Sequence, residues 1–142
     1  MFDVIVVGTD GSDTAEEATK AAIELAGQHE ATLHVVSSYK PKGAAHAQGG
    51  GGEHWDVKPR DGVDAILEAA AARARRQDVS VEVHASKQDP AKAILDVAAS
   101  VDADLIVVGN RGMQGAKRLL LGSVPNSIAH GAGCHVLVLK TT

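Results

Sequence analysis

Aromatic side chains are scarce in this sequence of 142 residues, in which Phe2, Tyr39 and Trp55 are the full set. Three scattered rings cannot form the stacking platform on which many proteins bind single-stranded nucleic acid. The core must therefore consist mainly of Ala, Val, Leu and Ile side chains. Apolar residues still make up 44% of the chain and charged residues 23%, a balance that is typical of a globular domain and excludes a wholly disordered chain.

The sequence also lacks a cysteine pair, an excess of positive charge and any long apolar run. Cys134 is the single cysteine, so neither an intramolecular disulfide nor a zinc site built from cysteines can form. The net charge of −4 offers no attraction to nucleic acid or to an anionic membrane surface. No apolar run approaches the roughly 18 residues that a membrane helix needs, and the first residues lack the features of a signal peptide. The sequence therefore predicts a cytoplasmic protein that binds neither nucleic acid nor membranes.

Two kinds of apolar pattern predict the strands. Val79, Val81 and Val83 alternate with polar residues, which is typical of an edge strand with one wet face. Continuous apolar runs are typical of strands that are buried on both faces. Such runs lie at residues 4–7, 105–108 and 136–139, and residues 33–36, which include His34, predict the second strand.

Apolar residues at a spacing of three or four predict helices between these strands. Ser12 or Asp13 is expected to cap the start of the first helix, and Gly27 to end it. Asp89 followed by Pro90 marks the start of the third, because a capping side chain precedes a proline at the first helical position. The other two helices are expected at residues 63–74 and 123–130.

Strands that alternate with helices predict a parallel sheet with right-handed crossovers. We expect one domain over residues 1–142 with a Rossmann-like α/β fold: an open five-stranded parallel sheet with strand order 3-2-1-4-5 and helices on both faces. Ligands of such sheets bind at the carboxyl ends of the strands, where the strand order reverses. Residues 40–62 interrupt the pattern, and their four consecutive glycines, Gly49 to Gly52, predict a mobile surface loop that could cover a bound ligand.

The segment after residue 108 carries glycines at two places. Gly109 and Gly112 permit a tight turn, and nine residues later Gly122 and Ser123 open a helix. Backbone N–H groups at a helix start bind anions, so this segment could cradle a polyphosphate. Three basic side chains could add charge to the cradle: Arg111, Lys117 and Arg118. The alternative is that the glycines only end a strand, turn the chain and cap a helix.

Asp10 lies at the same edge of the predicted sheet, between Thr9 and Gly11. Its carboxylate could accept hydrogen bonds from ribose hydroxyls or hold Mg²⁺ through water. An Asx turn, which is common for Asp beside Gly, is an equal alternative. Other established nucleotide motifs are lacking, since the chain has neither a P-loop nor the glycine pattern of dinucleotide-binding proteins.

Four segments together resemble the universal stress protein family. Gly109-x-x-Gly112, followed after nine residues by Gly122-Ser123, is similar to the ATP-binding signature of that family. The other three segments are residues 6–12, 104–109 and 136–139. Residues 122–126 look particularly like actinobacterial members, and the resemblance covers the chain except for the loop.

The resemblance implies a site for ATP, with cyclic AMP as the alternative ligand. Asp10, with Thr9 beside it, would lie on the ribose side and hold the Mg²⁺ that accompanies ATP. Ser38 would lie near the adenine, and Val108 would pack near the base. Further nucleotide contacts would come from Gly109, Arg111, Gly112, Gly122, Ser123 and Val124. One departure is Gln88, where members often carry glycine, and this change would alter the far wall of the pocket.

No general acid–base pair and no catalytic triad stands out in the sequence. We therefore expect an adenine-nucleotide-binding protein with a stress-response or signalling role, which acts through its ligand-dependent state rather than rapid turnover. Two alternatives remain: a weak ATPase in which Asp10 and Mg²⁺ orient water, and an interaction module whose glycines are only structural. Structural or solvated roles are expected for the seven histidines, and a small buried thiol for Cys134.

The final strand predicts a homodimer. In the order 3-2-1-4-5 the third and fifth strands are the edges of the sheet. Val136, Leu137, Val138 and Leu139 are apolar on both faces and carry no charge or proline that would protect an exposed edge. Pairing with the same strand of a second copy would cover this edge. The resemblance implies the same, since many family members dimerise by antiparallel pairing of this strand.

Overall fold

The computed structural model describes residues 1–40, 59–110 and 122–141, and strands and helices alternate along this part of the chain. The strands are β1 (Val4–Gly8), β2 (Thr32–Ser38), β3 (Val81–Ser86), β4 (Leu105–Gly109) and β5 (His135–Leu139). The helices are α1 (Asp13–His29), α2 (Arg60–Arg76), α3 (Pro90–Ser100) and α4 (Ser123–Gly131). Among these helices, none has both the length and the apolar character that crossing a bilayer requires.

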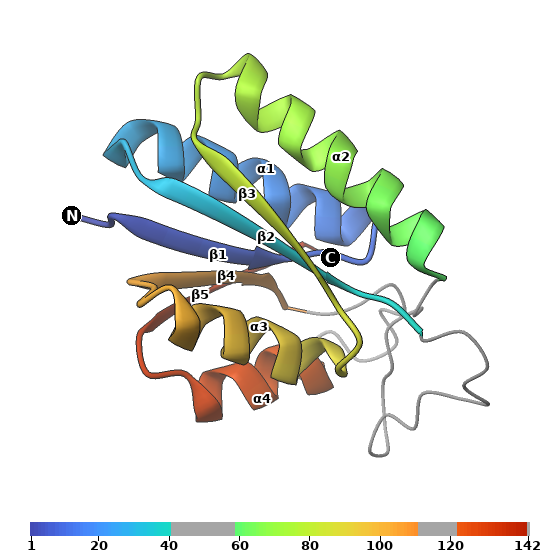
Figure 1. The fold of residues 1–142 in the computed structure, drawn as a ribbon. Coiled ribbons are helices and arrows are strands. Elements are labelled where there is room, and N and C mark those ends of the chain that lie inside the picture. The colour runs from blue at the N-terminus through green and yellow to red at the C-terminus, as the bar shows by residue number, and fades with distance from the viewer. Residues whose placement is uncertain (41–58, 111–121, 142) are drawn as a thin grey trace.

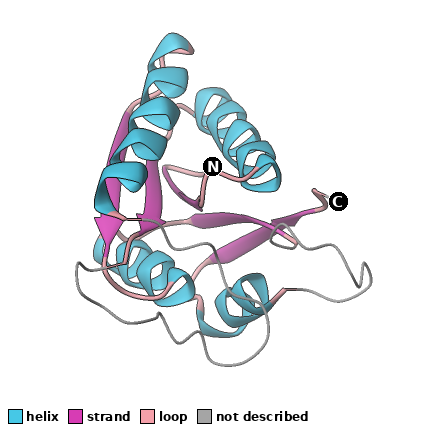
Figure 2. Ribbon diagram, turned by 90° about the vertical axis from the view of Figure 1, so that its right-hand side faces the viewer, coloured by secondary structure: helices cyan, strands magenta, loops and turns pink. Residues whose placement is uncertain are grey.

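The strands form one sheet in the order β3-β2-β1-β4-β5, and every neighbouring pair runs parallel. Figure 1 shows α1 and α2 on one face of the sheet and α3 and α4 on the other. The turned view of Figure 2 shows the sheet between these two layers of helices. The predicted fold class and strand order are therefore confirmed.

β1 shows how an unbroken apolar run is used in this sheet. Successive side chains of a strand point to opposite faces, so Ile5 and Val7 join the core beneath α1 and α2, whereas Val6 joins the core beneath α3 and α4. All three side chains are fully buried. Small residues such as Ala22 on α1 complete these cores, as the scarcity of aromatic residues requires.

The predicted end of α1 at Gly27 is wrong, because the helix continues to His29. Glu30 adopts the left-handed conformation at the C-cap, with φ 55°. Its N–H donates to the carbonyl oxygens of Ala26 and Gly27, and the Ala31 N–H donates to the same Ala26 oxygen at 2.9 Å. These bonds close the last turn without a glycine in the left-handed position, so the local glycine signal does not decide where the helix ends.

Side chains cap two of the helices. The Ser12 hydroxyl accepts from the Ala15 N–H at 3.3 Å at the start of α1, which decides between the two predicted caps in favour of Ser12. The Asp89 carboxylate accepts from the Lys92 N–H at 3.3 Å at the start of α3, and Pro90 follows in the first turn. The predicted start of the third helix is therefore confirmed.

α2 begins at Arg60, inside the loop that was predicted over residues 40–62, so the predicted end of that loop is wrong. Pro59 stands at the N-cap with φ −60°, and Arg60 pairs with Asp64 one turn later at 3.1 Å. These two local features support a helix that starts before the apolar stripe on which the prediction rested. Residues 41–58 of the predicted loop lie outside the described residues.

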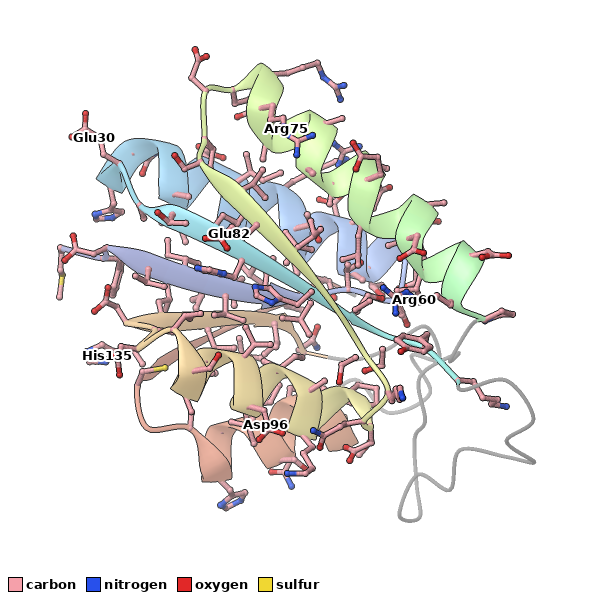
Figure 3. All side chains as sticks on the ribbon, in the orientation of Figure 1. Glu30, Arg60, Arg75, Glu82, Asp96 and His135 are labelled. Atoms are coloured by element: carbon pink, nitrogen blue, oxygen red, sulfur yellow. The ribbon has the colours of Figure 1, made fainter. Side chains whose placement is uncertain are left out.

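β3 lies at an edge of the sheet, as its alternating pattern predicted. Glu82 is exposed on this strand, where Figure 3 labels it. Val79 is buried just before the strand, but Val83 is 41% exposed. The face that was predicted to be buried, which carries the valines, is therefore not buried along the whole strand. An edge strand has no neighbour on its outer side, which leaves its side chains partly open to water.

A hydrogen-bonded pair of histidines connects β2 and β3. The Nδ1 atom of His34 lies 2.9 Å from the Nε2 atom of His84, and His34 is 5% exposed. The pKa of His84 lies below its ordinary value of 6.5, because burial disfavours the charged ring and a charged His34 would repel it, while Glu82 acts in the opposite direction. The neutral form of the His84 ring is therefore favoured in the folded protein.

We predict that this pair makes the fold sensitive to mild acid. Because the folded-state pKa of His84 is lowered, the unfolded chain takes up the proton first as the pH falls. The contribution of His84 to the free energy of unfolding is complete above pH 6.5 and is lost as the pH falls from there through the folded-state pKa.

Urea unfolding of the unmodified chain and of His84→Gln, at about pH 7.5 and about pH 5.5, measures this contribution. The variant should lose less free energy of unfolding between the two pH values than the unmodified chain. An equal loss in both chains would show that another group causes the acid sensitivity.

Candidate functional site

The carboxyl ends of β1 and β4 lie side by side at the centre of the sheet, where the strand order reverses. The chain leaves β1 toward α1 on one face and reaches α4 after β4 on the other face. Sheets of this kind bind ligands where two such connections diverge. In Figure 3, Arg60 marks this end of the molecule and His135 marks the opposite end.

The turn after β1 is held against β2 by two hydrogen bonds. The Thr9 N–H donates to the Val36 carbonyl oxygen at 2.9 Å, which extends the pairing of β1 and β2 one residue past Gly8. The Ser37 hydroxyl donates to the Thr9 carbonyl oxygen at 2.7 Å. Thr9 and Ser37 are each 2% exposed. The backbone of Thr9, a predicted site residue, is therefore fixed at the point from which Asp10 projects.

The Asp10 carboxylate forms an Asx turn. Its Oδ1 atom accepts from the Ser12 N–H at 2.9 Å, and the Thr9 hydroxyl accepts from the Gly11 N–H at 3.1 Å. The Asx turn, which the sequence analysis gave as the alternative role of Asp10, is therefore present. A carboxylate has two oxygens and about four lone-pair directions, so one bond in the turn is compatible with a ligand contact as well.

Gly11 is required at its position for two reasons. Its φ of 82° lies in the left-handed region that side chains disfavour. A Cβ atom at this position would lie 2.7 Å from Cδ1 and 2.9 Å from Cγ1 of Ile66, on α2. The turn that carries Asp10 is thus packed against α2 on one side and bonded to β2 on another.

Ser38 is the last residue of β2 and pairs in register with Ser86 of β3. It is 6% exposed, and its hydroxyl oxygen is buried without a hydrogen-bond partner. Within residues 1–40, 59–110 and 122–141 it is the single buried side-chain nitrogen or oxygen in that state. A buried hydroxyl that lacks a partner costs about 1–3 kcal/mol, so this atom calls for an explanation.

The start of α4 lies beside the end of β4. The Gly122 N–H donates to the Asn110 carbonyl oxygen at 2.9 Å, which places the N-cap of α4 at the carboxyl edge of the sheet. Gly122 offers no side chain as a cap, and the first turn carries no acidic residue. Val108 and Val124 are buried in the same core cluster. Two further predicted residues frame this region: Gly109, the last residue of β4, and Ser123, the first of α4.

This helix start has the electrostatic character of an anion site. The N-terminus of a helix carries partial positive charge, and here neither a capping side chain nor a first-turn carboxylate offsets it. Four predicted contributors lie outside the described residues: Arg111, Gly112, Lys117 and Arg118. What the structure brings together is the turn at Asp10, the end of β2 at Ser38, the end of β4 and the start of α4.

Cys134, for which the sequence predicts a structural role, is remote from this edge. Cys134 lies just before β5, at the amino end of the sheet, and burial together with the negative charge of Asp104 raises the pKa of its thiol. The reactive thiolate is therefore disfavoured. A cavity of about 180 Å³, lined mainly by alanine and glycine, lies at that same end and is distant from Asp10. The described residues contain no group of three side chains that could ligate a metal.

Two residues that hold the site were not identified from the sequence. Ser37 fastens the turn at Thr9, and Asn110 accepts from the start of α4. Each is the polar residue at which a strand reaches the carboxyl edge: Ser37 follows Val36, and Asn110 follows Gly109, the last residue of β4. This position in the sequence could have identified them, because a polar group there can form a hydrogen bond to the loop that follows a neighbouring strand.

The chain is similar in sequence to known proteins over nearly its whole length. Residues 1–140 match the model of the universal stress protein family. The chain is 32% identical to universal stress protein YxiE of Bacillus subtilis over 152 residues, which is 99% of this chain and 100% of that protein. It is 35% identical to universal stress protein Rv1636 of Mycobacterium tuberculosis over 144 residues, which is 99% of this chain and 98% of that protein.

Solved structures of similar proteins share the fold over nearly their whole length. A universal stress protein in complex with cAMP has a TM-score of 0.76 and 31% identity, with 99% of this chain and 98% of that chain covered. The universal stress protein from Archaeoglobus fulgidus in complex with dAMP has a TM-score of 0.72 and 26% identity, with 97% and 98% covered. The chain therefore belongs to the universal stress protein family.

Proposed function

We propose that this protein binds an adenine nucleotide at the carboxyl edge of β1, β2 and β4. ATP is the ligand we favour, and cyclic AMP is the alternative. The observation that carries the proposal is the buried Ser38 hydroxyl, which has no partner among the described residues. A nucleotide base offers nitrogen atoms that can bond to such a hydroxyl. The complexes of similar proteins with cAMP and dAMP support an adenine base.

The phosphates would lie at the start of α4. Backbone N–H groups of the first turn, at Ser123 and Val124, would bind them, since the next residue is Pro125 and has no N–H. Val108 and Gly109 would lie beside the base and ribose, and Arg111 and Gly112 would add contacts from the segment between β4 and α4. The role proposed for Gly122 is to leave space beside the helix start.

Asp10 would bind the ribose or the Mg²⁺ that accompanies ATP, with Thr9 holding its backbone. The residues fit this cation, because Mg²⁺ in nucleotide sites is commonly held by one or two carboxylates together with the phosphates. When bound, Mg²⁺ would screen the charge of the phosphates. Asp10 would orient the complex through one carboxylate oxygen while Oδ1 stays bonded to the Ser12 N–H.

The proposed physiological role is in stress response or signalling in the cytoplasm, through a change of state with the ligand. A second candidate function is slow hydrolysis of ATP, which the position of the Asp10 carboxylate favours because it could orient water through Mg²⁺. Release of phosphate by the pure protein, and its loss in Asp10→Ala, would favour the second candidate over simple binding.

We also propose a homodimer that pairs through β5. The strand is at the edge of the sheet, and residues 136–139 are only partly buried by the chain's own helices. The Leu139 oxygen accepts from Asn110 and the His135 N–H donates to Asp104, so the odd-numbered residues of β5 face β4. The backbone groups of Val136 and Val138 therefore point to the open edge, where a second copy would pair.

The Ser38→Ala variant tests the proposed base contact. Removing an unpartnered buried hydroxyl should raise the free energy of unfolding of the ligand-free protein by about 1 kcal/mol. The same change should weaken binding of adenine nucleotide about five- to tenfold, because the ligand loses its hydrogen bond. Calorimetric titration and urea unfolding measure the two effects.

Ser37→Ala is the matched control for stability, since the neighbouring hydroxyl does have a partner and its loss should lower the free energy of unfolding. A Ser38→Ala protein that binds nucleotide as tightly as the unmodified chain would contradict the base contact. A Ser38→Ala protein that is less stable would contradict the unpartnered state of the hydroxyl.

The Gly122→Val variant tests the proposed phosphate position. The backbone at Gly122, with φ −65° and ψ 169°, is open to any residue, so the fold should persist with a cost of about 1 kcal/mol at the N-cap. The added side chain should block the phosphates and weaken ATP binding by at least about tenfold.

Gly133→Val is the control for an added side chain, because a Cβ there meets no atom within 4 Å and the position is at the opposite edge. It should bind ATP like the unmodified chain. Undiminished ATP binding by Gly122→Val would place the phosphates elsewhere.

The Val138→Pro variant tests the homodimer. Proline removes a backbone N–H that points to the open edge and leaves the pairing with β4 intact, so the variant should become monomeric while it stays folded. Leu137→Pro, whose lost N–H faces β4, should instead destabilise the fold. Sedimentation at micromolar concentration measures the association, and an unmodified chain that sediments as a monomer would refute the proposal.

A further inference from the structure

Asn110, the first residue after β4, joins three segments of the chain. Its N–H donates to the Leu139 oxygen at 2.7 Å, at the end of β5, and its carbonyl oxygen accepts from the Gly122 N–H at 2.9 Å, at the start of α4. Its side-chain Oδ1 accepts from Thr141, from the backbone N–H at 2.9 Å and from the hydroxyl at 3.3 Å. One residue thus connects the last strand, the residues that follow it and the N-terminus of α4.

We infer that Asn110 is a positioning residue for the nucleotide, and that its side-chain bond to Thr141 orients the start of α4. The inference rests on the proposed function, in which this helix start binds the phosphates. Asn110 and Thr141 would act through Gly122, without the Asn110 side chain contacting the ligand.

The geometry explains why a side chain so close to the end of the chain would affect the site. The backbone of Asn110 bonds to β5 through its N–H and to the start of α4 through its carbonyl oxygen. A rotation of Asn110 would therefore shift the oxygen that accepts from the Gly122 N–H. The bond from Oδ1 to Thr141 adds a second link beyond Leu139, where the pairing of β4 and β5 has already ended. Thr141 is half-buried, so this link is partly shielded from water.

A site made of backbone N–H groups depends on the direction of those groups. Binding sites need their groups held to within about 0.5 Å and 10–20°, and the second layer of hydrogen bonds supplies that precision. The turn at Asp10 obtains it from Val36 and Ser37. The start of α4 obtains this precision from its bond to Asn110, which is itself bonded to Leu139 and Thr141.

The test removes the side-chain bond from either side and measures the affinity for ATP by calorimetry. Asn110→Ala removes Oδ1, and Thr141→Pro removes the N–H that donates to it. Each variant should bind ATP about tenfold more weakly. The double variant should bind no more weakly than either single variant, because both changes break the same bond. Thr141→Ala is the matched control, since it keeps the N–H and should stay within about twofold of the unmodified chain.

Asp104→Ala separates positioning from a general loss of stability. Asp104 accepts from the N–H groups of Asp3 and Val4 at 2.6 Å and 2.8 Å, at the opposite edge of the sheet. This variant should unfold more easily and yet bind ATP normally. Hydrogen exchange at the Gly122 amide is a second readout, and it should be faster in Asn110→Ala and Thr141→Pro than in Asp104→Ala.

Normal ATP affinity in Thr141→Pro and Asn110→Ala would overturn the inference, as would losses that add in the double variant. If Asn110→Ala fails to fold, Thr141→Pro still decides the question, because it lies beyond the last strand. Failure of the unmodified chain to bind ATP or cyclic AMP would instead contradict the proposed function.

Discussion

β1 pairs with a strand on each side and is covered by helices on both faces, and the rest of the structure depends on this double pairing. Its residues are matched in parallel register with β2 and with β4, so its backbone groups are satisfied without water. Parallel neighbours cannot be joined by a hairpin, and the chain must therefore cross over through α1 on one face and α3 on the other. The connections that begin at Asp10 and Asn110 consequently start side by side and diverge.

Hydrogen bonds between distant segments then fix this edge. Val36 and Ser37 hold the turn at Thr9, and the close approach of Gly11 to Ile66 packs the same turn on α2. Asn110 holds the start of α4. The polar groups of Thr9, Ser37 and Asn110 at this edge thus have hydrogen-bond partners. The buried hydroxyl of Ser38 has none among the described residues. A preorganised edge of this kind lowers the entropic cost of binding a small ligand.

The fold could be predicted from the sequence because its signals are local and agree with one another. The runs that end at Gly8 and Gly109 are apolar on both faces, and Asp89 before Pro90 starts a helix by itself. Predicted boundaries failed where hydrogen bonds and ion pairs between nearby residues, rather than a glycine or the apolar stripe, decide them. α1 passes Gly27 and ends at His29, and α2 starts at Arg60 ahead of its apolar stripe. Position after the first strand identified Asp10 as a candidate, and family resemblance identified Ser38. No periodicity could reveal the bonds among Asn110, Gly122 and Thr141, because they join segments that meet only in the folded chain.

Native mass spectrometry of the unmodified protein, freshly purified and then titrated with ATP or cyclic AMP, tests nucleotide binding most directly. It reports the mass of the ligand and the number of subunits in one spectrum. We expect each subunit to gain the mass of one adenine nucleotide, in a complex of two subunits. A protein that stays free of nucleotide at saturating concentrations of both ligands would contradict the proposed site.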